Sequence, residues 1–255
     1  MNLDAARRIS LPVLIVALFT GLAACTPVKQ GSEQADGQLG SAGFLTNYDL
    51  LKPTASGDGV VDYVYVDPNL AADLEKYSGV MVDQPEIIIA ADSPYRGAKP
   101  EGMKLVADVI RYMMMGEFIR GGYNLVEEPA DDIVYLRIGL TDLNVERNAG
   151  VSAYIPTQIT VDNEAEVARN FMSTLTITEV NVEIEIVNSS TSEVLMAGIA
   201  NMAFDDAGDD PLANWQALGL KLERIAAGIT CVVQTADLPP GAQREICSAR
   251  VSSGY

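Results

Sequence analysis

The stretch from residue 179 to residue 186 alternates between polar and apolar side chains, and this alternation constrains the fold more than any other feature. The apolar set is Val180, Val182, Ile184 and Ile186, and the polar set is Glu179, Asn181, Glu183 and Glu185. Successive side chains of a β-strand point to opposite faces, so the pattern predicts an antiparallel strand with one packed face and one wet face. Glu183 and Glu185 are therefore expected on a solvated sheet face.

Further strands are predicted on both sides of this one. Residues Asn188–Ser192 have the composition of a turn, and Val194–Phe204 reads as the hairpin partner that returns from it. Four more segments are rich in β-branched and aromatic residues: 60–66, 80–91, 123–127 and 133–145. Within the second of these, Pro85 indicates an edge position or a bulge, because proline cannot donate a ladder hydrogen bond.

Two long segments have apolar residues at helical spacing. The first is Glu101–Arg120, which Gly121-Gly122 should end. The second is a stripe made by Trp215, Leu218, Leu222, Ile225 and Ile229. Shorter helical patterns follow Asp67-Pro68, ending near Tyr77, and lie over residues 164–171 inside a long insertion at 147–173.

These elements predict the fold class. No linker or internal repeat divides residues 43–255, so they are expected to form one domain. Strands outnumber helices, and consecutive strands can pair locally. The predicted fold is therefore α+β, with a mainly antiparallel β-sheet and two principal helices packed on one face.

The N-terminus resembles a bacterial lipoprotein signal peptide over residues 1–24. Arg7 and Arg8 precede a twelve-residue apolar stretch, and the sequence Leu22-Ala23-Ala24-Cys25 is similar to the lipobox that lipoprotein signal peptidase recognises. The resemblance implies cleavage before Cys25 and transfer of a diacylglyceryl group, with acyl chains such as palmitate, to its thiol. An ordinary signal peptide, or a buried helix with an incidental cysteine, is the alternative.

Residues 25–42 are predicted to be the lipidated cysteine and a flexible tether. Glycine, serine and glutamine predominate after Cys25 and no aromatic residue is present, so the segment cannot bury enough area to fold. Its root-mean-square reach is roughly 20–25 Å. Thr26 stands where an inner-membrane retention signal would place aspartate, which favours the outer membrane with the domain facing the periplasm.

The formal charge of −18 limits the partners. Acidic chains are repelled by phosphate backbones and by anionic lipid surfaces, so no nucleic acid is expected and the membrane should be held through the N-terminal lipid alone. In an oxidising envelope compartment the two remaining thiols, Cys231 and Cys247, are expected to form a disulfide worth roughly 3 kcal/mol. Two separate thiols are the alternative.

Few residues in the chain suggest catalysis. The absence of histidine excludes Ser-His and Cys-His hydrolases and any histidine metal site. Glu183 and Glu185 would lie about 6.8 Å apart on one strand, but they point the same way rather than across a cleft. Asp205, Asp206, Asp209 and Asp210 could bind calcium, although a polar loop whose Asp209 or Asp210 caps the next helix explains them better. No catalytic residue and no cofactor is expected.

Three segments together resemble a bacterial lipoprotein family known as domain of unknown function 3313. They are Ser41–Pro53, then Tyr65–Pro68 with Tyr77, Val80 and Val82 downstream, and the stretch from Val182 to Leu195. In the turn, Asn188 stands where the family pattern would place an acid, and Ser192 where it would place a glycine. The resemblance implies a fold and a compartment but no chemistry.

The sequence therefore predicts a noncatalytic, lipid-anchored envelope protein. Its domain would bind another envelope protein or component through a sheet edge or an exposed strand face. The alternative is a carboxylate- or calcium-dependent envelope enzyme.

Overall fold

A computed structural model describes much of the predicted domain. The described residues are 41–54, 60–73, 76–95, 99–148, 155–156, 158–160, 162–204, 210, 212–235 and 246–247. All of them belong to one compact unit, Gly31–Tyr255. The predicted signal peptide, Cys25 and most of the tether therefore lie outside the described residues.

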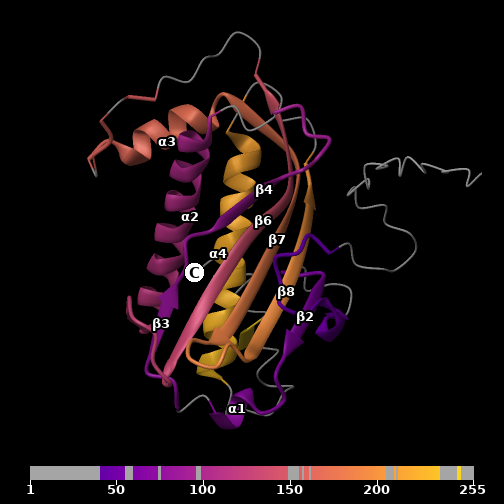
Figure 1. Cartoon of the computed structure of the whole chain (residues 1–255), viewed down its shortest axis with the longest axis vertical. Coiled ribbons are helices and arrows are strands. Elements are labelled where there is room, and N and C mark those ends of the chain that lie inside the picture. The colour runs from indigo at the N-terminus through magenta and orange to yellow at the C-terminus, as the bar shows by residue number, and fades with distance from the viewer. Residues whose placement is uncertain are drawn as a thin grey trace, which may run out of the picture. The chain divides into compact units, whose positions relative to one another are not determined.

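An eight-stranded sheet forms the centre of this unit (Figure 1). Its strands are β1 (Lys52–Pro53), β2 (Tyr63–Val66), β3 (Gly79–Val82), β4 (Glu86–Ile89), β5 (Asn124–Leu125), β6 (Ile133–Arg147), β7 (Leu175–Asn188) and β8 (Val194–Ala203). They are arranged in the order β1-β2-β8-β7-β6-β3-β5, and β4 also pairs with β6. The alternating pattern seen in the sequence lies in β7, one of the three long central strands.

The sheet is mixed, which corrects part of the fold prediction. The pairs from β1 to β6 through β2, β8 and β7 are antiparallel as predicted, but β3 and β4 run parallel to β6, and β5 runs parallel to β3. The helix between β4 and β5 carries the chain back along the sheet, so that β5 begins at the same end as β3. A crossover of this kind makes the strands that it connects parallel. The single strand expected at 80–91 is also divided in two, with buried Pro85 between β3 and β4.

The helices are α1 (Leu70–Asp73), α2 (Pro100–Arg120), α3 (Glu164–Met172) and α4 (Ala213–Gln234), and a short 3-10 helix η1 covers Tyr48–Leu50. Figure 1 shows α2 and α4 running side by side along one face of the sheet, as predicted. The main core lies between these two helices and the apolar side chains of β6 and β7, such as Leu140 and Val182. The third helix, α3, packs against the N-terminal half of α2.

The β7–β8 turn places a residue other than glycine in a left-handed backbone conformation. Ser192 adopts φ +60°, the left-handed region in which glycine is favoured. The Asn188 side chain stabilises the turn, because its oxygen accepts hydrogen bonds from the backbone N–H groups of Ser190 and Thr191 at 2.9 Å. The hairpin therefore keeps its geometry with a strained serine where a glycine would fit.

Cys231 and Cys247 form a disulfide, as the sequence predicted, with their Cα atoms 5.6 Å apart. Cys231 is buried near the C-terminal end of α4, so the bond attaches residue 247 to that helix. Within the described part of the chain, no helix is long and apolar enough to span a membrane.

Candidate functional site

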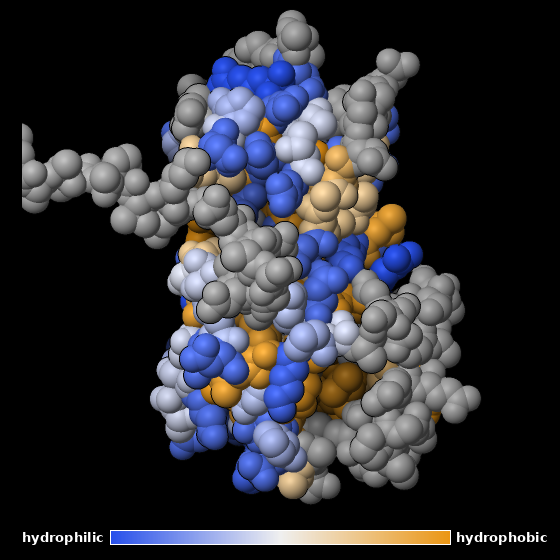
Figure 2. All heavy atoms as spheres, turned by 90° about the vertical axis from the view of Figure 1, so that its right-hand side faces the viewer, coloured by the Kyte–Doolittle hydropathy of each residue, from blue (hydrophilic) through white to orange (hydrophobic). Residues whose placement is uncertain are grey.

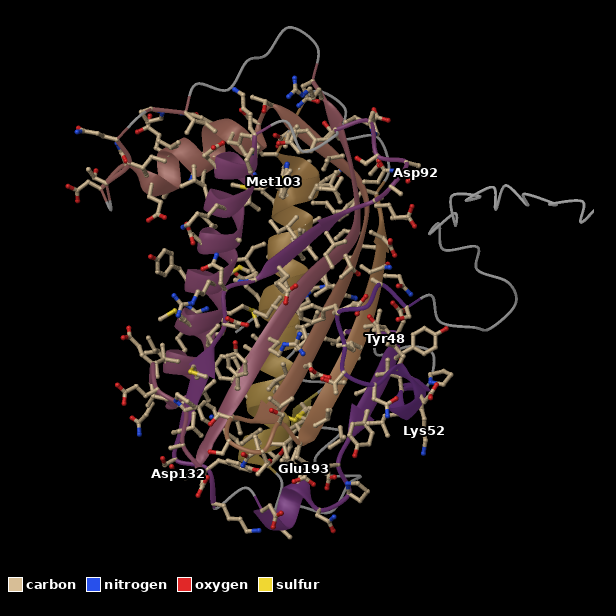
Figure 3. The ribbon with its side chains drawn as sticks, in the orientation of Figure 1. Tyr48, Lys52, Asp92, Met103, Asp132 and Glu193 are labelled. Atoms are coloured by element: carbon tan, nitrogen blue, oxygen red, sulfur yellow. A yellow bond between two sulfur atoms is a disulfide. The ribbon has the colours of Figure 1, made fainter. Side chains whose placement is uncertain are left out.

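Residues Gly43–Leu51, called the strap below, lie against the sheet face opposite α2 and α4. Phe44, Leu45 and Leu51 are buried there in a small second core with Ala197 and Ile199 of β8. Neighbouring residues of β8 on the other face join the main core instead. Figure 3 labels Tyr48 in this segment, on the side of the sheet away from the two long helices.

Glu185 holds the first half of the strap. Its Oε1 accepts the backbone N–H of Thr46 at 2.8 Å, and its Oε2 accepts the Thr46 hydroxyl at 2.9 Å. Arg137 Nη1, from β6, donates to the same Oε2 at 2.6 Å. Glu185 is therefore a buried carboxylate with a cation and two further hydrogen-bond donors.

Glu183 holds the second half of the strap through a different set of groups. The Tyr48 hydroxyl donates to its Oε2 at 2.5 Å, and the Thr141 hydroxyl donates to its Oε1 at 2.6 Å. The Tyr48 oxygen in turn accepts the backbone N–H groups of Phe44 at 3.1 Å and Leu45 at 3.3 Å. No basic side chain of the described residues forms an ion pair with Glu183.

The prediction that Glu183 and Glu185 lie on a solvated sheet face is wrong for both residues. Glu183 is 1% exposed and Glu185 is 0% exposed, because the strap covers them. Only Glu179, farther along the same face, is exposed. Figure 2 looks at this side of the domain and shows hydrophobic side chains mixed with hydrophilic ones rather than a continuous polar surface.

Two residues of β6 shape the floor beneath the strap. Arg137 pairs directly opposite Glu185 in the sheet, donates from Nη2 to the Phe44 carbonyl at 3.2 Å, and places its guanidinium 4.8 Å from the centre of the Phe44 ring. Gly139 leaves room for that ring, since a Cβ there would lie 2.8 Å from it. The Oε1 atom of Glu86, on β4, lies 3.8 Å from Nη2 of Arg137.

Burial sets the electrostatics of Glu183 and Tyr48. Desolvation raises the pKa of Glu183 above its ordinary value, and the hydrogen bonds from Thr141 and Tyr48 only partly oppose it. The nearby negative charge of Asp142 raises the pKa of Glu183 further. Desolvation and the bond to Glu183 likewise raise the pKa of Tyr48.

The arrangement is suited to holding a chain segment. All four carboxylate oxygens of the two glutamates accept hydrogen bonds from strap or sheet donors. Carboxylates that act as general acids, bases or nucleophiles must reach a substrate, whereas these two are covered by Phe44, Leu45 and Tyr48. Their role in the structure is to attach the strap to β7.

A family model described as a protein of unknown function (DUF3313) matches residues 41–227. The chain belongs to the DUF3313 family. The matched region begins at the strap segment and includes every residue of the carboxylate network, while Cys231 and Cys247 lie beyond it. Comparison with curated proteins finds no match.

Several solved structures resemble parts of this DUF3313 chain. A putative neuraminyllactose-binding hemagglutinin homolog from Helicobacter pylori is 12% identical, with a TM-score of 0.37, and the match covers 71% of this chain and 92% of that one. A minor lipoprotein from Acinetobacter baumannii is 10% identical, with a TM-score of 0.31 and coverage of 64% and 97%. The PelC dodecamer from Paraburkholderia phytofirmans is 12% identical, with a TM-score of 0.30 and coverage of 63% and 94%. TM-scores this low carry no functional inference.

The remaining sequence candidates are only partly described. Asp205, Asp206 and Asp209 lie outside the described residues. Asp210 accepts the backbone N–H of Leu212 at 2.9 Å in a turn just before α4. The N-cap of α4 is Leu212, and none of the described side chains caps the helix, so the expected cap at Asp210 is wrong. The described residues contain no group of three or more acidic or cysteine side chains that could hold a metal ion.

Proposed function

We propose that this DUF3313 protein is a noncatalytic, lipid-anchored module of the bacterial cell envelope. A lipid on Cys25 would hold it at the outer membrane, with residues 26–42 as the tether and the domain facing the periplasm. The observation that supports the proposal most directly is the residue at which the chain begins to pack against the sheet. The predicted tether ends at residue 42, and Phe44 and Leu45 are 4% and 5% exposed. The strap is therefore suited to attach a tether firmly to the sheet.

The hydrogen bonds of the buried carboxylates support a noncatalytic role. Glu183 and Glu185 are the most deeply buried acidic side chains of the described residues, and both are engaged by the strap and by β6. An apolar cavity of about 50 Å³ lies between the sheet and the C-terminal ends of α2 and α4, lined by residues such as Val80, Phe118 and Ile229. Substrate pockets are commonly several hundred Å³ with convergent polar groups, so this cavity is a poor candidate for one.

An envelope protein is the partner class that we propose. A strongly acidic domain gains little from an anionic lipid surface, which leaves protein surfaces as the natural ligands of a tethered module. Crosslinking in the native envelope followed by mass spectrometry would identify the partner. Recovery of only lipid or polysaccharide adducts would contradict a protein partner.

Acyl labelling combined with membrane fractionation tests the anchor. Wild type should take up label and sediment with membranes, and Cys25→Ser should lose both properties while its folded domain stays intact. The double variant Cys231→Ser/Cys247→Ser is the matched control, because it removes the other two thiols and should still be labelled. An unlabelled wild type, or a Cys25→Ser variant that remains equally membrane-bound, would contradict the proposal.

A further inference from the structure

The two buried glutamates differ in one respect that matters for the strap. Glu185 has Arg137 at 2.6 Å as a counter-ion, so its negative charge is compensated inside the protein. Glu183 is contacted by neutral donors, namely the hydroxyls of Tyr48 and Thr141 and the backbone N–H of Leu45. Burying an ionised carboxylate without a cation is costly, and the cost is relieved when the group takes up a proton or returns to water.

The other charged groups near Glu183 do not compensate it. On β6, Asp142 adds a second negative charge, and Arg137 is engaged by Glu185 and approached by Glu86 of β4. On β7, Glu185 itself is a neighbouring acid two residues away. On β8, the residues paired with Glu183 and Glu185 are Ile199 and Ala197, which carry no charge. From above, the strap offers two neutral donors, the Tyr48 hydroxyl and the Leu45 backbone N–H.

We propose that the strap is a latch governed by one proton, held most firmly when Glu183 is neutral and loosened when Glu183 ionises. When the strap lifts, water reaches Glu183 and removes the cost of its charge. Proton binding and strap docking are then linked, so that each favours the other.

The direction of the pH dependence follows from this linkage. The pKa of Glu183 is raised while the strap is docked and returns toward its ordinary value when the strap is released. The stabilisation of the docked strap by protonated Glu183 is therefore complete below the ordinary pKa of a glutamate. It is lost as the pH rises through the raised pKa of docked Glu183. The latch is tighter below the ordinary pKa of a glutamate and looser above the raised pKa of docked Glu183.

Release would change the length of the tether, a consequence that rests on the proposed lipid anchor. The strap comprises the nine residues 43–51, which span at most about 30 Å when extended. Lifting the strap would add that length to the tether. The domain could then reach partners farther from its membrane, and acidification would draw it back.

Hydrogen exchange of the full-length protein in detergent tests the latch. The reporter is the Thr46 amide, which donates to Glu185, and the central amides of β7 serve as a reference for global unfolding. Protection at Thr46, corrected for intrinsic exchange, should fall by up to about tenfold per pH unit across the interval between the released and docked pKa values, then level off. The β7 amides should stay protected.

Three variants isolate the proton. Glu183→Gln should remove the pH slope and leave Thr46 at least as protected as in wild type at neutral pH. Tyr48→Phe should lower the protection at every pH and keep the slope. Glu179→Gln, the same substitution at an exposed position on the same strand face, should behave as wild type.

Two results would overturn the latch: wild-type protection at Thr46 that does not change with pH, or a slope that persists in Glu183→Gln. Neither measurement depends on lipidation. Failure of the latch is therefore distinguishable from failure of the lipid anchor, which acyl labelling tests separately.

Discussion

Replacing Arg137 by methionine should destabilise the domain by leaving Glu185 buried without its cation. Glu185 is fully buried and Arg137 is about a quarter exposed, so solvent screens the pair only weakly. Breaking a buried ion pair from one side typically costs about 3–5 kcal/mol. The Thr46 amide and hydroxyl still donate to the carboxylate, which places the expected loss at the lower end, about 3 kcal/mol.

Urea unfolding followed by tryptophan fluorescence measures this loss. Trp215 is the only tryptophan, and it is buried in α4, on the sheet face opposite the strap. Its indole N–H donates to the backbone carbonyl of Leu175 in β7. It reports global unfolding without touching the strap. A loss of about 3 kcal/mol should lower the thermal midpoint by about 6–12 °C.

The double variant Arg137→Met/Glu185→Gln separates lost packing from the uncompensated charge. With Glu185 neutralised, most of the stability lost in Arg137→Met should return, since a neutral amide can still accept the Thr46 hydrogen bond. A loss below about 1 kcal/mol in the single variant would refute the reasoning. A double variant no more stable than the single one would refute it equally.

Three further predictions concern other contacts. Gly139→Ala should cost about 1–3 kcal/mol in urea unfolding, because its Cβ would displace the Phe44 ring, and an unchanged midpoint would contradict that contact. Ser192→Gly should raise the stability by about 0.5–1 kcal/mol by relieving the positive φ, whereas a lower thermal midpoint would show that the serine is not strained. Reduction should add about two daltons to the intact mass as the Cys231–Cys247 bond opens, and no gain in mass would exclude the bond in the purified protein.

The strand pattern predicted β7 correctly but assigned its polar face to water. Alternation shows which side chains share a face, and it says nothing about what lies above that face. The groups that cover Glu183 and Glu185 come from Tyr48 and Thr46, which are 135 and 139 residues away in the chain. A local pattern has no information about contacts at that separation.

Two signals in the sequence could have indicated the covered face. Phe44, Leu45 and Leu51 follow a tether that has few large apolar residues and no aromatic one, and apolar side chains of that size need a surface to bury them. Arg137 also lies on the strand predicted at 133–145, where it could pair with an acid across the sheet. Together these features favour a segment packed over a charged strand face.

The parallel half of the sheet was missed for a different reason. The helix between residues 100 and 120 was predicted accurately, and its position between strands implies a crossover connection. The sequence predicts a single strand at 80–91, with Pro85 at an edge position or in a bulge. Once Pro85 divides it into β3 and β4, both pieces pair in parallel with β6 on the same side.

Polar groups beneath the strap explain how a short segment can dock in one position only. Thr46 and Tyr48 are two residues apart, as are their partners Glu185 and Glu183, so the contacts run antiparallel to β7. Apolar contacts alone tolerate sliding, because one buried side chain can replace another of similar size. A shift of the strap by two residues would leave one buried carboxylate oxygen without its donor from the strap, at a cost of about 1–3 kcal/mol. The two glutamates therefore determine the residue at which the chain leaves the sheet, and with it the point where a tether would begin.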